Sequence, residues 1–289
     1  MEERFRITKK AGIYGILGNI FLLILKSIVG FASKSQAMIA DSINSAGDIF
    51  ASLMTFIGNK IASVPGDESH NFGHGKAEYI FSLFIAISMM FVSIKTLLDA
   101  VVTLFTGNQI IFSWWLVIVC IVTIIIKAIL FFYTKNMHKK YNNILLEASM
   151  ADHRNDCIIT TFTLISVLLS LKGITWFDSI VGIAISAWIF KTGIEIFIES
   201  YNILMDVSID EKTKDIILDL VHAYKEIKGV NELSSTPVGY QYIVFLTIAV
   251  EGNMTTFDSH KLADDLEKTI IKLDKVFKAI VHVEPYFGD

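Results

Sequence analysis

Two pairs of oxygen-bearing side chains stand four residues apart in otherwise apolar stretches. Asn44 and Asp48 form one pair, and Asp152 and Asp156 form the other. On an α-helix, a spacing of four turns the second side chain by only about 40° from the first, with a rise of about 6 Å. Each pair therefore presents its oxygens from one helix face. Three carboxylates and one amide carbonyl are hard donors, which suit Mg²⁺, Ca²⁺ or Mn²⁺ better than Zn²⁺ or Cu⁺.

Two nearby side chains are further candidates for the same ion. His153 precedes Asp156 by three residues and could reach a metal from that flank. It is also turned by about 100° from Asp152, which favours a position facing a neighbouring helix. Asp41 precedes Asp48 by seven residues and so lies near the same helix face, about 10 Å further along. We interpret Asp41 either as lining an exit path or as an acid stabilised by the helix N-terminus.

The chain that must position these groups is too apolar for a soluble protein. Of its 289 residues, 53% are hydrophobic and 19% are charged, and the mean hydropathy is +0.55. Soluble domains have about 25% charged residues, so the composition excludes a soluble enzyme. Two cysteines are too few for a disulfide scaffold. Six apolar stretches are each long enough to cross a hydrocarbon core of about 30 Å, at residues 12–32, 37–62, 80–105, 113–134, 147–171 and 176–200.

These stretches predict an all-α transmembrane bundle of six helices, with the polar pairs in the second and fifth. Counting along both spans places the four side chains about 12 to 21 Å below the outer boundary, near the bilayer midplane. The alternative is that they are separate polar residues bonded to neighbouring helices. That alternative explains Asn44 well, but three buried acids need protons or a cation. We therefore predict one shared cation site between the two helices.

Basic residues gather on one side of the predicted bundle. Nine Lys and Arg residues near the span ends lie on that side, against Lys34 and Lys172 on the other. Because cytoplasmic loops carry an excess of Lys and Arg, the pattern predicts a multi-pass protein of the cell membrane with both termini in the cytoplasm. The first apolar stretch is too long for a cleaved signal peptide and lacks a small-residue cleavage site, so we expect it to be retained.

The hydropathy falls after Asp206, and residues 207–289 are predicted to form a small cytoplasmic α+β domain distinct from the transmembrane domain at 1–206. This segment holds 9 Lys and Arg against 14 Asp and Glu, which does not suit a nucleic-acid binder. Ser208 and Glu211 predict a capping box that opens a helix to about residue 227. Two strands, a helix and a last strand complete the order α-β-β-α-β, at residues 229–235, 241–250, 257–273 and 277–283.

In its six spans, its C-terminal domain and its paired ligands, the chain resembles the cation diffusion facilitator family of divalent-metal and proton antiporters, from about residue 10 to the end. The loop Pro65–Glu78, with the sequence PGDESHNFGHGKAE, looks like the family's signature after the second span. Zinc-transporting members usually begin the fifth-span pair with histidine, whereas Asp152 stands there in this chain and Asn44 begins the second-span pair. This combination is similar to the bacterial manganese-exporting branch. The resemblance implies a homodimer in the lipid bilayer that exports Mn²⁺ in exchange for protons, with no bound cofactor.

The resemblance also implies roles for the loop and for the ends of two spans. A loop metal site is implied at Asp67, His70 and His74, although the two histidines could equally cap and brace the loop. A charge pair that holds the third and sixth spans at the dimer interface is implied at Lys76 and Asp206.

A regulatory metal site is implied less strongly in the C-terminal domain. His260, His282 and Glu284 match positions that bind metal in zinc-type members. Asn231 and Ala249 stand where those members often carry histidines. We therefore expect weak or absent metal binding there, and a domain that mainly supports dimerisation.

Two rival functions stay open at this point. The nearer rival is a transporter of the same fold for Zn²⁺, Fe²⁺ or Cd²⁺. The more distant one is an intramembrane metal-dependent hydrolase, because a metal held by carboxylates can also activate water. The sequence has no additional base among the ligands and no substrate-pocket motif, so it favours a transporter that is not an enzyme.

Overall fold

The computed structural model describes residues 2–32, 36–106, 113–171 and 176–286. The chain divides into two compact units, and each is described by itself. The first unit joins Met1–Ser63 to Ala77–Tyr201, and the second joins Val64–Lys76 to Asn202–Asp289. The loop that follows the second helix therefore belongs to the same unit as the C-terminal residues.

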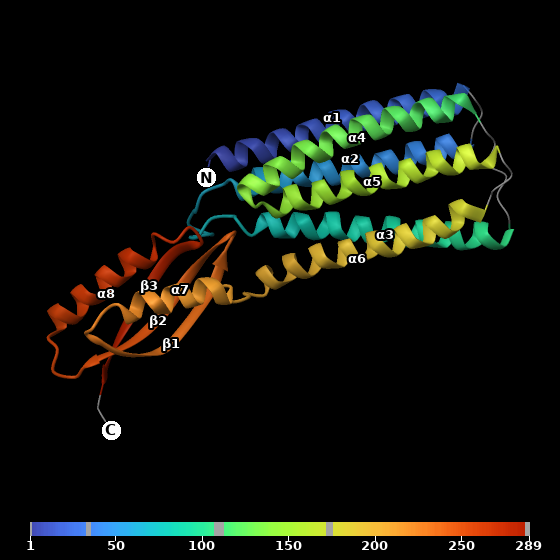
Figure 1. Cartoon of the computed structure of the whole chain (residues 1–289). Coiled ribbons are helices and arrows are strands. Elements are labelled where there is room, and N and C mark those ends of the chain that lie inside the picture. Colours follow the sequence, from blue (N-terminus) through green and yellow to red (C-terminus); the bar gives the residue numbers. More distant parts are fainter. Residues whose placement is uncertain (1, 33–35, 107–112, 172–175, 287–289) are drawn as a thin grey trace. The chain divides into compact units, whose positions relative to one another are not determined.

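The described residues of the first unit form six long helices, which Figure 1 labels. They are α1 Glu2–Ala32, α2 Gln36–Ala62, α3 Ala77–Thr106, α4 Trp114–Tyr141, α5 Ile144–Ser170 and α6 Trp176–Leu204. Helix α1 packs along α2, and α4 packs along α5, while α2 also contacts α3 and α5. Each predicted span overlaps one of these helices, because long apolar stretches satisfy their backbone hydrogen bonds internally as helices. Helix α1 begins ten residues before the predicted span at 12–32, and α4 ends seven residues after the one at 113–134.

Within the described residues, four helices are long and apolar enough to cross a membrane: α1, α3, α4 and α6. The other two, α2 and α5, carry the polar pairs together with further charges such as Lys60 and Arg154, which lower their hydropathy. A multi-pass membrane protein is thus supported. The crossing of the bilayer by α2 and α5 stays a prediction.

A buried ionic network joins the starts of α1, α3 and α5. The Arg4 guanidinium donates to both carboxylate oxygens of Glu78, at 2.7 and 2.5 Å, and both side chains are buried. Asn143 donates to the same carboxylate at 3.0 Å. Its amide oxygen also caps α5 by accepting from the backbone N–H groups of Leu145 and Leu146. The Glu78 carboxylate therefore accepts hydrogen bonds from both Arg4 and Asn143, and it links the three helices at this end of the bundle.

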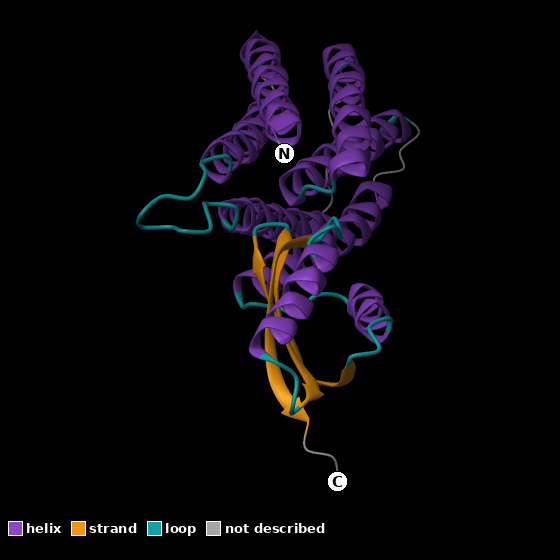
Figure 2. Ribbon diagram, turned by 90° about the vertical axis from the view of Figure 1, so that its left-hand side faces the viewer, coloured by secondary structure: helices purple, strands orange, loops and turns teal. Residues whose placement is uncertain are grey.

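The second unit contains a three-stranded sheet and two helices (Figure 2). Its elements are α7 Glu211–His222, β1 Ile227–Val238, β2 Gln241–Glu251, α8 Thr256–Ile270 and β3 Val276–Tyr286. The central strand β2 pairs antiparallel with β1 and parallel with β3. Because a parallel pair needs a crossover connection, α8 stands between β2 and β3. The order α-β-β-α-β agrees with the sequence prediction.

Alternate residues of β2 form the core of this unit. Val244, Leu246 and Ile248 are buried in one cluster with Ile217 of α7 and Leu266 of α8. Residues two apart in a strand point to the same face of the sheet. Both helices therefore pack against one face of β2.

The boundaries of α7 differ from the prediction. The capping box predicted at Ser208 and Glu211 is wrong, because Asp210 occupies the N-cap position. The predicted end near Ile227 is also wrong, since the helix ends at His222 and Ile227 begins β1. The chain needs the intervening residues to turn from the helix into the sheet.

Replacing Asp210 with alanine is expected to loosen α7. The Asp210 carboxylate accepts hydrogen bonds from Lys275 at 2.6 Å and from the Thr213 backbone at 3.2 Å, and these bonds hold the pKa of Asp210 below its ordinary value of 3.8. Its stabilisation is therefore present above that value and is lost as the pH falls through the lowered pKa. At pH 7, Asp210→Ala should cost about 1 kcal/mol of local stability, measured as faster hydrogen exchange of the α7 amides.

Asp210→Asn is the matched control for this prediction, because asparagine also caps helices but does not form the ion pair with Lys275. It should accelerate exchange less than the alanine variant. Equal exchange rates in the wild type and Asp210→Ala would contradict the assignment of Asp210 as the cap.

Candidate metal-binding site

Acidic side chains of α2 and α5 meet at one small cavity in the first unit. The cavity has a volume of about 50 Å³, and its lining includes Asp48 of α2 with Asp152, Asn155 and Asp156 of α5. Side chains of α3 and α6 complete the wall, among them Ser88. A single water needs about 10 to 15 Å³ of such space. The cavity therefore has room for one ion with a small number of waters.

Two candidate residues of α2 are not placed at this cavity. The backbone of Asn44 and Asp41 belongs to α2, but their side chains are not among those that the structure describes. Their roles stay predictions. Of the four primary candidate ligands, the structure brings Asp48, Asp152 and Asp156 to one cavity.

A lysine that the sequence analysis did not select lies between the two acidic helices. Lys127 of α4 has a fully buried side chain, and its Nζ donates to Asp48 Oδ2 at 2.8 Å and to Asp156 Oδ2. One ammonium group thus bridges a carboxylate of α2 and a carboxylate of α5. The available signal was a lysine inside a strongly apolar span, which is costly enough to mark a functional site by itself.

Asn155 is a second residue that the sequence analysis did not select. It is 4% exposed and lines the cavity beside Asp152 and Asp156. Within the described residues, neither its amide oxygen nor its amide nitrogen has a hydrogen-bond partner. An unpaired buried amide is costly, so Asn155 has an oxygen available for a cation or for its bound water. The sequence signal for Asn155 was its spacing of three from Asp152, which places both side chains on the same side of α5.

His153 lies at the flank of the cavity. One ligand atom from each of Asp152, His153 and Asp156 lies within 4.8 Å of the others. The imidazole Nδ1 is 3.9 Å from Asp152 Oδ2, too far for a hydrogen bond. A Cβ placed on Gly15 of α1 would be 3.8 Å from His153 Nε2. The ring therefore stands between the acids and α1, in reach of the site but also facing a neighbouring helix.

Arg154 points away from the three acids, because it stands two residues from both Asp152 and Asp156 and so lies on another face of α5. Its guanidinium carbon lies 4.5 Å from the centre of the Trp188 ring, and it donates to the Thr192 hydroxyl at 3.4 Å. Both partners belong to α6. Arg154 therefore supports the packing of α5 on α6.

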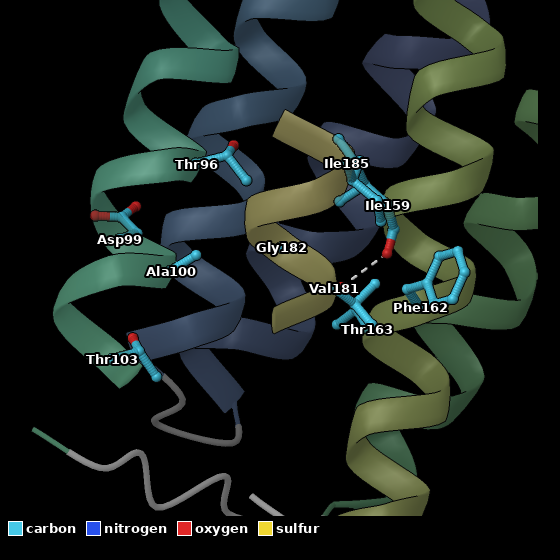
Figure 3. Close-up of a pocket in the computed structure, with 10 residues that line it drawn as sticks. All are labelled: Thr96, Asp99, Ala100, Thr103, Ile159, Phe162, Thr163, Val181, Gly182 and Ile185. Carbon is cyan, nitrogen blue, oxygen red and sulfur yellow. Dashed lines mark hydrogen bonds between the residues drawn. The ribbon is translucent and has the colours of Figure 1, made fainter. Parts of the chain in front are cut away.

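A larger cavity lies between α3, α5 and α6 (Figure 3). It has a volume of about 250 Å³ and shares Ile159 with the smaller one. Thr96, Thr103 and Thr163 line it, and Thr163 donates to the Ile159 carbonyl at 2.9 Å. The carboxylate of Asp99 points away from the other lining residues in Figure 3. This cavity therefore offers hydroxyl groups and apolar side chains, and its acid is turned outward.

The loop candidates form a cluster in the second unit. One ligand atom from each of Asp67, His70 and His74 lies within 4.8 Å of the others. The Asp67 carboxylate also accepts the backbone N–H groups of His70 and Ser69, and the His70 bond holds the pKa of Asp67 below its ordinary value. The two imidazole rings are 4.4 Å apart. The backbone bonds of Asp67 brace the loop, and the closeness of its three side chains suits a metal. The arrangement is therefore compatible with both roles.

The two members of the implied charge pair are in contact. Lys76 Nζ donates to Asp206 Oδ1 at 2.7 Å, and the Thr236 hydroxyl donates to the same oxygen at 3.0 Å. These bonds, that from Lys76 first, hold the pKa of Asp206 below its ordinary value. The pair therefore ties the Val64–Lys76 loop to the end of α6 within the second unit.

The C-terminal candidates fall into two places. His260 of α8 lies 3.8 Å from Asp264 of the same helix. On β3, His282 is 3.9 Å from Glu284, whose other oxygen accepts a hydrogen bond from Asn231 at 2.6 Å. Asn231 therefore occupies one oxygen of Glu284, at a position where zinc-type members often carry histidine.

Comparisons with known proteins cover almost the whole chain. The model of the cation efflux transmembrane domain matches residues 12–205, and that of the cation efflux protein cytoplasmic domain matches residues 209–286. An uncharacterized transporter of Methanocaldococcus jannaschii is 30% identical, over 96% of this chain and 99% of that protein. In Bacillus subtilis, the manganese efflux system proteins MneP and MneS are 26% and 27% identical. The alignments cover 100% of this chain and 99% of MneP, and 98% of this chain and of MneS. These matches confirm the family resemblance drawn from the sequence.

Proposed function

This chain belongs to the cation efflux family, and we propose that it exports Mn²⁺ from the cytoplasm in exchange for protons. The family supports efflux of divalent metal cations in general. The observation that carries the specific proposal is the meeting of three carboxylates, Asp48, Asp152 and Asp156, from two helices at one cavity. Such a site in a bundle of apolar helices suits a hard cation in transit better than a permanent structural role.

The donor atoms of the site favour Mn²⁺ over Zn²⁺. The three acids and Asn155 offer oxygen, whereas zinc sites usually recruit histidine or cysteine. The one imidazole nearby, His153, stands at the flank of the acids. Two relatives that align over nearly the full chain are named as manganese efflux proteins. Transport of Zn²⁺, Fe²⁺ or Cd²⁺ by the same site is the nearest alternative.

Proton exchange follows from the chemistry of the same acids. Carboxylates must be deprotonated to bind a metal, so a bound metal and a bound proton compete for one oxygen. In the proposed cycle all six long helices span the membrane, with both termini in the cytoplasm. Rocking of the bundle exposes the site first to one side and then to the other, as in other secondary transporters.

The proposed protein is a homodimer. In the second unit, Phe245 and Ile280 lie side by side in register on the sheet face opposite the helices, and they are 40% and 39% exposed. Exposed neighbouring apolar side chains are often covered by a partner. A small domain of this size also gains stability by association.

A metal-panel transport assay tests the proposed function. Purified protein in proteoliposomes with an imposed pH gradient should move Mn²⁺, and the internal pH should change as it does so. Mn²⁺ should move faster than Zn²⁺, Fe²⁺ or Cd²⁺. Absence of flux for every divalent cation would contradict the transporter assignment, and faster Zn²⁺ flux would contradict the choice of metal.

Exchange of one ligand should alter this selectivity. Asp152→His places an imidazole in the cavity wall and removes one carboxylate, so it should shift transport toward Zn²⁺. We expect a rise of about tenfold in the Zn²⁺ to Mn²⁺ flux ratio, measured by competition in proteoliposomes. Asp152→Asn is the control, because it removes the charge without adding nitrogen. An unchanged ratio in Asp152→His would place selectivity elsewhere.

A further inference from the structure

The ammonium group of Lys127 occupies the position that a metal bridging α2 and α5 would take. Its Nζ contacts one oxygen of Asp48 and one of Asp156, and its side chain is fully buried. A divalent ion held by the same two oxygens would lie between them in the same way. Lys127 is therefore a cation already seated among the proposed ligands.

The ammonium and a divalent ion cannot share this position. Two like charges at contact distance repel each other, and both cations need the lone pairs of Asp48 Oδ2 and Asp156 Oδ2. Breaking the two ion pairs without replacing the cation would leave two partly buried carboxylates, 17% and 22% exposed, without a counter-charge, which is costly. Entry of a metal supplies that replacement charge, so the two cations exchange with each other.

A buried hydroxyl lies one turn along α4 from Lys127. Thr123 is 1% exposed, and its hydroxyl has no hydrogen-bond partner within the described residues. Side chains four residues apart on a helix share a face, and long side chains lean toward the helix N-terminus. An ammonium that leaves the two acids toward the N-terminus of α4 would therefore meet the Thr123 hydroxyl inside the bundle.

We propose that Lys127 is a tethered cation that fills the empty transport site and withdraws toward Thr123 when the metal binds. The inference rests on the proposed function, since it requires that Asp48 and Asp156 hold the transported ion. Lys127 thereby sets the affinity of the site. A metal must displace it to enter, and its return helps to expel the metal on the far side.

This exchange has a measurable effect on binding. If the form with Lys127 withdrawn makes up about a tenth to a hundredth of the metal-free protein, the apparent Kd is about 10- to 100-fold higher than that of the open site. Lys127→Met removes the competitor and keeps most of the side-chain volume. It should therefore bind Mn²⁺ about 10- to 100-fold more tightly than the wild type, and it should release the ion more slowly.

Thr123→Val should act in the opposite direction. The substitution keeps the side-chain shape but removes the hydroxyl that accepts the displaced ammonium, so Lys127 stays longer between the acids. Mn²⁺ binding should weaken several-fold. This variant breaks no hydrogen bond within the described residues, so it tests the proposal even if Lys127→Met does not fold.

The experiment is isothermal titration of purified full-length protein with Mn²⁺, combined with flux in proteoliposomes. Lys135→Met is the matched control, because Lys135 lies on the exposed side of the same helix with its Nζ 5.3 Å from the Phe131 ring centre. Its affinity should equal that of the wild type. Tighter binding in Lys127→Met, with slower flux, and weaker binding in Thr123→Val support the proposal.

Failure of this inference differs from failure of the proposed function. If the wild type binds and transports Mn²⁺ but folded Lys127→Met binds it equally or more weakly, Lys127 is not a competitor. Unchanged binding in Thr123→Val would equally overturn the withdrawal toward Thr123. If the wild type neither binds nor transports Mn²⁺, the proposed function itself is wrong.

Discussion

Mn²⁺ flux is expected to fall about 100-fold or more when Asp156 is replaced by alanine. The substitution removes a carboxylate that lines the cavity and pairs with Lys127, and loss even of a group that only supports a metal ligand costs about 10- to 100-fold. The pH change that accompanies transport should disappear with the flux. Asp48→Ala should behave in the same way, because it removes the acid contributed by α2. Both quantities can be followed in proteoliposomes by a metal-sensitive dye and a pH-sensitive dye.

Asp99→Ala is the control for this pair of variants. Asp99 is also an acid on a long apolar helix, but its carboxylate points away from the neighbouring cavity (Figure 3). Its removal should leave Mn²⁺ flux close to that of the wild type. Folded Asp156→Ala protein that retains wild-type flux would rule out the proposed transport site.

Replacing Arg4 with methionine is expected to have the largest effect on stability. Glu78 is 1% exposed and receives two hydrogen bonds from the Arg4 guanidinium. Removing one partner of a buried ion pair leaves an uncompensated charge, at a cost of about 3 to 5 kcal/mol. The unfolding free energy of the purified protein in denaturant should fall by that amount.

The double variant Arg4→Met/Glu78→Gln separates the lost pair from the lost packing. The neutral amide no longer requires a cation and can still accept from Asn143, which bonds to Glu78 at 3.0 Å. It should therefore recover much of the stability lost in Arg4→Met. A single variant as stable as the wild type would mean that the network does not hold this end of the bundle together.

The helices and the order of the C-terminal elements could be predicted because local patterns specify them. Long apolar stretches overlap the six long helices, and the strand predicted at residues 241–250 is β2. The spacing of four was also sufficient to select Asp152 and Asp156 as neighbours on one face. Their carboxylates line one cavity with that of Asp48, and the depth of this cavity in a bilayer stays a prediction.

Features that depend on distant partners could not be predicted in the same way. Ser208 and Asp210 are both favourable N-cap residues, and the choice of Asp210 involves Lys275, 65 residues away. Lys127 carries no oxygen donor, and no periodicity shows that α4 packs beside α5 with its lysine toward α2. The unpaired amide of Asn155 becomes visible only after the helices are packed.

Anomalous diffraction at the manganese absorption edge, from crystals of the wild-type protein grown with Mn²⁺, tests the central claim most directly. We predict a peak between α2 and α5, with oxygens of Asp48, Asp152 and Asp156 within about 2.0 to 2.6 Å, the range for hard divalent cations and oxygen ligands. Lys127 Nζ should no longer bridge the acids in that structure. A manganese peak confined to the Asp67, His70 and His74 loop, with none between the two helices, would contradict the account.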